Sequence, residues 1–263
     1  MINFFKKQKK QKPWIRFFSL EQGLPEIYPI KLRSSIKQPW QENKEKSKCP
    51  ITNKRNSAKC PAIKQISKIG WVVQAPMDFA IYTNGDGSSF EWTAANNFKS
   101  QSKDYITFHD IDQTAKILDR PNDTLKRIIK VDTPWRITAS EDIVLLQQHI
   151  HWNNENRFTA VTGVIDPQFT LQVNVQLQWH ILNSGKEGIL IEAGTPLAQF
   201  IPIPRIYLEK NWYDISIENA NSKDWDLEKA VDYAMSAKYV DKDDVYGRIH
   251  RVKKAIKYYK TKK

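Results

Sequence analysis

Residues 171–179 carry the pattern that most constrains how this chain folds. Along this stretch apolar and polar side chains alternate one by one. The apolar positions are Leu171, Val173, Val175, Leu177 and Trp179. Successive side chains of a β-strand point to opposite faces, so a period of two predicts a strand with one buried face.

Other short segments of the middle region also look like strands. The runs 79–82 and 90–93 flank the sequence Asn84-Gly85-Asp86-Gly87, which predicts a β-hairpin. Further runs rich in Val, Ile, Thr and aromatic residues lie at 70–76, 105–108, 126–131, 134–138, 142–151, 157–161, 188–192 and 197–203. We therefore predict a mainly β fold, a compact β-clip or jelly-roll-like barrel or sandwich.

The charge of the chain divides it into parts. The 263 residues carry a formal net charge of +12, but residues 1–70 hold 17 Lys and Arg against 4 acids. Residues 71–205 hold 11 against 15. We predict a basic extended N-terminal arm at 1–68, a β domain at 69–208 and a helical C-terminal segment at 209–263.

The arm and the C-terminal segment differ from the β domain in their patterns. Aromatic residues interrupted by prolines at 13–46 predict an extended segment that docks through its rings. Helical spacing of apolar residues predicts helices at 227–239, capped by Asp224 or Asp226, and at 243–259.

The basic arm has two interpretations. It could contact a polyanion, including nucleic acid without sequence preference, through a set of lysines. These are Lys6, Lys7, Lys9, Lys10 and Lys12. It could equally be a solvated tail. No run approaches eighteen apolar residues and no apolar segment follows the first charges, so we expect neither a membrane span nor a secretory signal.

The two cysteines, Cys49 and Cys60, exclude a disulfide-rich scaffold and any all-cysteine zinc site. They could close one small loop in an oxidising compartment or remain free thiols. The sequence does not distinguish a disulfide from two free thiols.

His149, His151 and Glu155 form the one candidate metal site. On a strand, His149 and His151 would share a face, and Glu155 could join them from the following turn. This His-x-His-x3-Glu spacing resembles the first metal motif of cupins. The resemblance implies a metal-dependent enzyme of the oxygenase type with a divalent cation. The residue where the cupin's last ligand would stand is Leu197, so at most three protein ligands remain. The alternative is a packed or hydrogen-bonded histidine pair.

Two further segments resemble the motifs of deoxyuridine triphosphatases and the related deoxycytidine triphosphate deaminases. The first is Gly163-Val164-Ile165-Asp166, which leads through Phe169 into the alternating strand. The second is Gly194-Thr195-Pro196-Leu197-Ala198-Gln199. The resemblance covers about residues 130–204 and implies a β-clip scaffold that often trimerises. It also implies a ligand site with Gly163, Asp166 and Gln199, in which Asp166 would be the candidate catalytic acid.

The chain differs from that family at the residues that carry out catalysis and bind phosphate. Gln168 replaces the second acid and Phe169 the tyrosine. The Arg-Ser phosphate-binding motif and the glycine-rich arm are missing from their places. A lone carboxylate without cations or anion-binding amides cannot stabilise a transferring phosphoryl group. Asp166 also has a structural interpretation as a turn residue that caps backbone amides.

We therefore expect a non-catalytic binding or assembly protein on a dUTPase-like scaffold, phage-encoded and either associated with the virion or interacting with a host protein, and located in the virion or the host cytoplasm. It would be a homo-oligomer, with a trimer favoured, and would have a capsid or other protein partner and no required cofactor. The alternatives are a cupin-like metal enzyme using His149, His151 and Glu155, and a diverged nucleotide hydrolase using Asp166.

Overall fold

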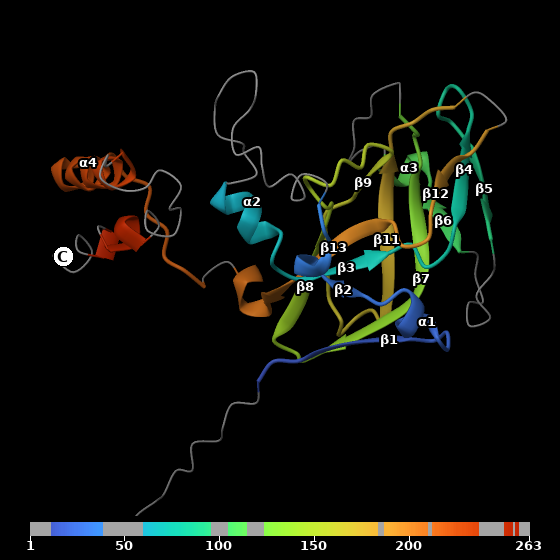
Figure 1. The fold of residues 1–263 in the computed structure, drawn as a ribbon, viewed down its shortest axis with the longest axis horizontal. Helices are drawn as coiled ribbons and strands as arrows, with labels where there is room; N and C mark the ends of the chain where they lie inside the picture. The colour runs from blue at the N-terminus through green and yellow to red at the C-terminus, as the bar shows by residue number, and fades with distance from the viewer. Residues whose placement is uncertain are drawn as a thin grey trace, which may run out of the picture. The chain divides into compact units, whose positions relative to one another are not determined.

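The structure is a computed structural model that describes most of the chain. The described residues are 12–38, 60–95, 105–114, 124–183, 187–209, 212–236, 250–254 and 256–257. The chain divides into two compact units, Met1–Trp212 and Tyr213–Lys263, whose elements are labelled in Figure 1. The boundary falls close to the predicted start of the C-terminal segment at residue 209.

The first unit is mainly β, as predicted, and the strand pairs among its described residues are antiparallel. One sheet is centred on β7 (Ile128–Ala139), which pairs with β1 (Ile15–Ser19), β6 (Ile106–His109) and β11 (Gln172–Trp179), and β11 pairs with β9 (Phe158–Ala160). A second sheet has the order β10 (Gly163–Ile165), β8 (Ile143–Gln148), β13 (Pro196–Pro204), β3 (Trp71–Gln74) and β2 (Lys31–Leu32). A third has the order β12 (Ile189–Ile191), β4 (Phe79–Thr83) and β5 (Phe90–Ala94).

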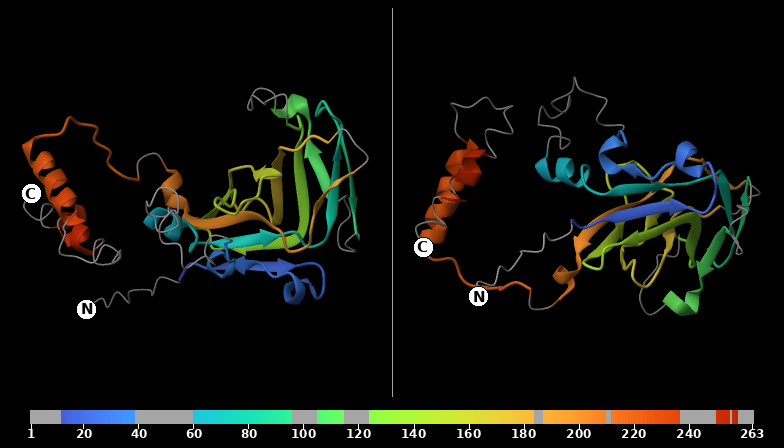
Figure 2. Two further views of the ribbon diagram at one scale, coloured as in Figure 1. Left: turned by 45° about the horizontal axis from the view of Figure 1, so that its top comes forward. Right: turned by 90° about the horizontal axis from the view of Figure 1, so that it is seen from below.

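One hydrophobic core takes side chains from all three sheets, whose strands are drawn from two further sides in Figure 2. Val175 of β11 comes from the first sheet, Val73 of β3 from the second and Phe79 of β4 from the third. The described strands form open sheets and none closes into a barrel. The helices of this unit are short: α1 (Leu24–Ile27), α2 (Pro61–Ile66), α3 (Ile111–Thr114), and the 3-10 turns η1 (Arg33–Ser35) and η4 (Arg205–Leu208).

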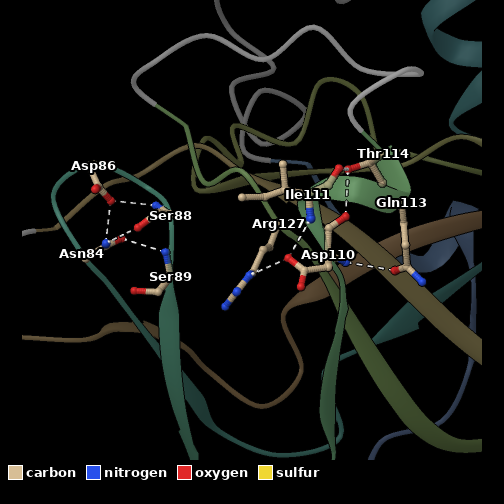
Figure 3. A network of polar contacts seen from close by, with 9 residues as sticks. All are labelled: Asn84, Asp86, Ser88, Ser89, Asp110, Ile111, Gln113, Thr114 and Arg127. Atoms are coloured by element: carbon tan, nitrogen blue, oxygen red, sulfur yellow. Dashed lines mark hydrogen bonds and ion pairs between the residues drawn. The ribbon is translucent and has the colours of Figure 1, made fainter.

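The alternating strand is β11, and its side chains obey the predicted period from residue 172 onward, whereas Leu171 precedes the strand and is 52% exposed, so its predicted place on the buried face is wrong. Val173, Val175, Leu177 and Trp179 are at most 1% exposed. The polar residues between them are half-buried. The predicted hairpin is β4–β5, whose register pairs Thr83 with Phe90. Its turn is bound by polar contacts among Asn84, Asp86, Ser88 and Ser89 (Figure 3).

Part of the predicted basic arm belongs to the β unit. β1 pairs with the end of β7, from Ile15 opposite Ala139 to Ser19 opposite Trp135. The ring of Phe17 meets that of Trp71 edge-on, with centroids 5.8 Å apart. The aromatic anchors thus pack as a strand against the domain. Lys12 is exposed, whereas Lys6, Lys7, Lys9 and Lys10 lie outside the described residues.

Two predicted strand boundaries are wrong. The runs 126–131 and 134–138 form the single strand β7, which passes through Pro134. The run 142–151 ends early, because β8 stops at Gln148 and a turn begins. Trp152 and Asn154 of that turn have φ values of 65° and 55°, a left-handed conformation that ends a strand.

The second unit contains α4 (Ser222–Ser236), and residues 250–254 and 256–257 are also helical. The predicted cap of the first helix is wrong. Asn221 Oδ1 accepts from the backbone N–H of Asp224 at 3.3 Å, and Asp224 Oδ2 accepts from the N–H of Asn221 at 2.9 Å. This reciprocal pair is a capping box that starts the helix earlier than predicted.

Two remaining predictions concern the cysteines and the membrane. Cys60 is an exposed free thiol, and Cys49 lies outside the described residues. Among the helices that the structure describes, none is both long and apolar enough to cross a membrane.

Candidate functional site

A polar cleft of about 230 Å³ lies where the chain passes from β9 through β10 to β11. Its lining residues are uncharged, and six of them carry an amide or a hydroxyl group. They are Gln147, Val161, Thr162, Gly163, Val164, Ile165, Thr170, Gln172, Asn174 and Gln176. The cleft therefore offers hydrogen-bond donors and acceptors but no side-chain charge.

Gln147 of β8 is the most informative residue of this lining. Its side chain is 5% exposed, and its Nε2 donates to the carbonyl oxygen of Val161 at 3.0 Å. That bond fixes which end of the amide is oxygen. The other end, Oε1, is buried and has no hydrogen-bond partner among the described residues. Buried acceptors are almost always paired, so an unpaired one on a cleft wall needs an explanation.

Asn174 of β11 supplies a second acceptor of the same kind. Its Oδ1 is buried and has no hydrogen-bond partner among the residues that the structure describes. Its neighbour Gln172 is held in place, because Nε2 donates to Asp132 Oδ1 at 3.2 Å. The Asp132 carboxylate also accepts from Thr107 Oγ1 at 2.8 Å and lies 3.3 Å from Lys130 Nζ. Gln172, one of the amide side chains that line the cleft, is therefore held by the buried carboxylate of Asp132.

Gly163 begins β10 opposite Gln147. No heavy atom lies within 4 Å of the place where a Cβ would stand on it. The glycine therefore leaves the backbone edge of the cleft open. Its φ is not in the left-handed region, so the open space, rather than a strained backbone, distinguishes this position.

Asp166 follows β10 at the turn beside the cleft, and its carboxylate is fully engaged. Arg205 binds it with both terminal nitrogens, the Nη2–Oδ1 contact measuring 2.7 Å and the other joining Nη1 to Oδ2. Oδ1 also accepts from the backbone N–H of Gln168 at 3.0 Å. Arg205 is itself fixed, because its Nε donates to the carbonyl oxygen of Glu141 at 2.6 Å.

These contacts determine the charge state of the pair. The hydrogen bonds from Arg205 hold the pKa of Asp166 below its ordinary value, outweighing the opposing effect of desolvation. Asp166 is thus a charged group that fixes the turn 166–170. The turn holds Thr170 at the cleft and leaves the ring of Phe169 87% exposed.

The candidate metal ligands lie elsewhere and have other partners. His149 and His151 follow the end of β8, with ring centroids 5.4 Å apart, and His149 Nδ1 accepts from the N–H of Ala160 at 3.2 Å. Glu155 forms a bidentate pair with Arg157, with Nε–Oε1 at 2.8 Å and Nη2–Oε2 at 2.6 Å. Within the described ranges, no three His, Cys, Asp or Glu side chains are grouped so that they could hold a metal ion.

Burial lowers the pKa of His149, and the charge of neighbouring His151 acts in the same direction, while Glu155 opposes them. Burial alone would raise the pKa of Glu155, but its hydrogen bonds with Arg157 lower it overall. His149 therefore favours the neutral form and Glu155 the charged, paired form. This arrangement explains both groups as parts of a packed turn.

Comparison with known proteins gives a likeness of fold. No family model matches this chain, and no curated protein matches it. Among solved structures, the dUTPase of EIAV is 15% identical over 59% of this chain and 88% of that one, with a TM-score of 0.29. A mutant dUTPase from phage phi11 of S. aureus is 8% identical over 59% and 85%, with a TM-score of 0.31.

A dUTPase mutant of Staphylococcus bacteriophage 80alpha with dUpNHpp is 11% identical over 59% of this chain and 77% of that one, with a TM-score of 0.29. At these identities and TM-scores the likeness concerns the β-rich fold alone and supplies no argument about activity.

The structure brings together only some of the residues that the sequence singled out. Gly163 lines the cleft and Asp166 stands next to it. Gln199 is 2% exposed within β13 and is not among the lining residues. Its Nε2 donates to the carbonyl oxygens of Ile66 at 3.0 Å and Ile69 at 2.8 Å. It ties β13 to the chain that follows α2.

Sequence reasoning missed Gln147, Gln172, Asn174 and Gln176. The last three are the polar positions of the alternating strand, which looks like an ordinary solvated face. A signal was present, because every polar residue between 172 and 178 is an amide and none is charged. Solvated faces are usually rich in Lys and Glu.

Proposed function

We propose that this chain is a non-catalytic binding protein that holds a small uncharged ligand in the amide-lined cleft. The observation that carries the proposal is the buried, unpaired Oε1 of Gln147. An acceptor left unsatisfied in this way costs about 1–3 kcal/mol. A ligand that donates a hydrogen bond there would remove that cost on binding.

The lining defines the chemistry of the ligand. Gln147 Oε1 and Asn174 Oδ1 are two free acceptors, so the ligand should present N–H or O–H groups. The lining carries no cation, so a phosphate would gain little there. A nucleobase or nucleoside, which has ring and exocyclic N–H donors on an uncharged flat ring, matches this class. The exposed ring of Phe169 beside Thr170 offers an apolar surface nearby.

The same contacts argue for binding rather than hydrolysis. Both oxygens of Asp166 accept hydrogen bonds within the protein, so this carboxylate is a poor candidate for activating water. Glu155 is likewise engaged by Arg157. The assembly role, the phage origin and the location in a virion or host cytoplasm stay predictions from the sequence.

A thermal-shift panel of nucleobases, nucleosides and matching triphosphates tests the proposal. At a hundred times its Kd, a ligand of the folded state stabilises by about 2.7 kcal/mol. For a unit of about 200 residues this raises Tm by about 5–10 °C. We expect an uncharged nucleoside to give such a shift and its triphosphate to give no larger one.

Two alanine variants of one strand provide the control. Asn174→Ala removes an acceptor of the cleft and should weaken binding about tenfold, equivalent to about 1.4 kcal/mol. Gln178→Ala changes an amide of the same face that does not line the cleft, and should leave binding unchanged. A shift that needs the triphosphate and disappears in Asp166→Ala would instead support the diverged hydrolase.

A further inference from the structure

A second open site lies between β5 and β6. Among the described strands, β5 pairs only with β4, and β6 pairs only with β7. A groove of about 570 Å³ separates their free edges. It is lined by Phe90, Glu91 and Trp92 of β5 and by Ile106, Thr107 and Phe108 of β6. Free strand edges are templates for pairing with another extended chain.

The floor of this groove is apolar. Phe90 and Trp92 pack against the core from β5, and Ile106 does so from β6. The ring of Phe108 is 47% exposed and meets Phe90 edge-on, with centroids 5.7 Å apart. The groove therefore offers both backbone hydrogen bonds and an apolar surface, the two requirements for adding a strand.

Figure 3 shows two polar networks that lie next to the ends of β5 and β6 in the sequence. The Asn84 turn precedes β5, and Asp110 follows β6. Arg127 donates to Asp110 Oδ1 at 3.2 Å and places its guanidinium 4.8 Å from the centroid of Phe108. These contacts fix the two edges without filling the space between them.

The chain also contains a strand-like segment that has no strand partner among the described residues. In 213–217, Tyr213, Ile215 and Ile217 alternate with Asp214 and Ser216. The three apolar side chains are 57%, 71% and 95% exposed. The segment has neither helical nor strand pairing, although its period of two is typical of a strand with one buried face. It is five residues long, as is β5.

We propose that residues 213–217 of a second copy of this chain form a strand between β5 and β6. Tyr213, Ile215 and Ile217 cover the apolar floor, while Asp214 and Ser216 face outward, near Glu91. The added strand pairs on both sides. It joins β4, β5, the donated strand, β6 and β7 into one continuous sheet.

Chain length favours a second copy over the same chain. Arg205 N–H donates to the carbonyl oxygen of Asp142 at 2.7 Å, just past the end of β7 at Ala139. β6 pairs with β7 from Val131 toward Ile128. Eight residues of strand separate Val131 from Ala139, a distance of about 26 Å at 3.3 Å per residue.

The connection available within one chain is shorter. From Arg205 to Leu208 the 3-10 turn η4 advances about 6 Å. Five further residues to Tyr213 add at most about 17 Å. The sum, about 23–24 Å, is shorter than the strand length that separates Ala139 from Val131, so the chain lengths favour a segment donated by a second copy.

Mixed cysteine pairs test this proposal. In a Cys49→Ser, Cys60→Ser background, one protein carries Glu91→Cys and the other Ser216→Cys, and the two are mixed and treated with a short bis-maleimide. We expect a covalent dimer on a denaturing gel. A matched donor with Glu228→Cys, exposed on α4, should give at least tenfold less.

Light scattering of the cysteine-free parent and of an Ile215→Asp, Ile217→Asp variant completes the test. The parent should be oligomeric at tens of micromolar and the variant monomeric but still cooperatively folded, because the replaced side chains are exposed in the single chain; the Tm of the parent should fall on dilution to that of the variant. A monomeric parent would overturn the proposal. So would a cross-link that forms only when both cysteines are in one chain. Neither result depends on the amide-lined cleft.

Discussion

Replacing Gln147 with leucine should stabilise the ligand-free protein, although the residue is 5% exposed and hydrogen-bonded. Gln147→Leu keeps the approximate size of the side chain. It removes the bond from Nε2 to the carbonyl oxygen of Val161, a loss of about 0.5–1.5 kcal/mol, because Val161 is only half-buried at the cleft and water can replace the lost donor. It also removes the unpaired Oε1, whose burial costs about 1–3 kcal/mol. The difference is a gain of about 1 kcal/mol.

Gln199→Leu is the matched control. Gln199 is equally buried, at 2% exposed, but its Nε2 donates to two carbonyl oxygens, those of Ile66 and Ile69. The same substitution there breaks both bonds and should destabilise by about 1–3 kcal/mol. The two variants therefore move stability in opposite directions.

Urea denaturation and calorimetry measure both changes. For a unit of this size, 1 kcal/mol corresponds to about 2–4 °C in Tm. Gln147→Leu should raise Tm by this amount while abolishing nucleoside binding. A fall in stability of 2 kcal/mol or more would refute the reasoning, because it would show that Oε1 is satisfied in the free protein and is not reserved for a ligand.

Three further variants test the rest of the structure. Arg205→Gln should raise the pKa of Asp166 toward the ordinary value of about 3.9, visible in a carboxyl NMR titration, because the hydrogen bonds from Arg205 that lower it are lost. In the wild type this pair stabilises the fold above that ordinary value, and its contribution is lost as the pH falls through the lowered pKa. Burial lowers the pKa of His149 below about 6.5, so the unfolded chain takes up a proton first and the wild type loses stability as the pH falls below that value. His149→Gln should remove this loss when urea midpoints at pH 5 and pH 8 are compared. Gly70→Ala should destabilise by about 2–6 kcal/mol in the same assay, because φ is +73° and a Cβ would stand 2.1 Å from the Phe200 carbonyl oxygen.

The fold could be predicted from the sequence because its strands carry local signals. The alternation in β11 and the Asn-Gly turn of β4–β5 each specify a strand or a hairpin from neighbouring residues alone. The strands that were predicted wrongly depend on contacts between residues far apart in the sequence. Nothing local showed that β7 would continue through Pro134, or that residues 15–19 would pair with its far end.

The candidate site was less predictable, because its defining features are long-range. Arg205 meets Asp166 across 39 positions of sequence, and Gln147 reaches the cleft from β8. The family resemblance predicted a site with Gly163 and Asp166, which lie at the cleft, and with Gln199, which does not line it. Glu155 was predicted as a metal ligand for a similar reason. The sequence did not show that its partner in the fold would be Arg157.

A crystal structure of the protein with the nucleoside that gives the largest thermal shift tests the central claim most directly. We predict a ligand N–H or O–H donating to Gln147 Oε1 within about 3.2 Å, with Asp166 and Arg205 still paired beside it. A ligand bound elsewhere, or a cleft in which Gln147 Oε1 is already bonded to the protein, would contradict this account.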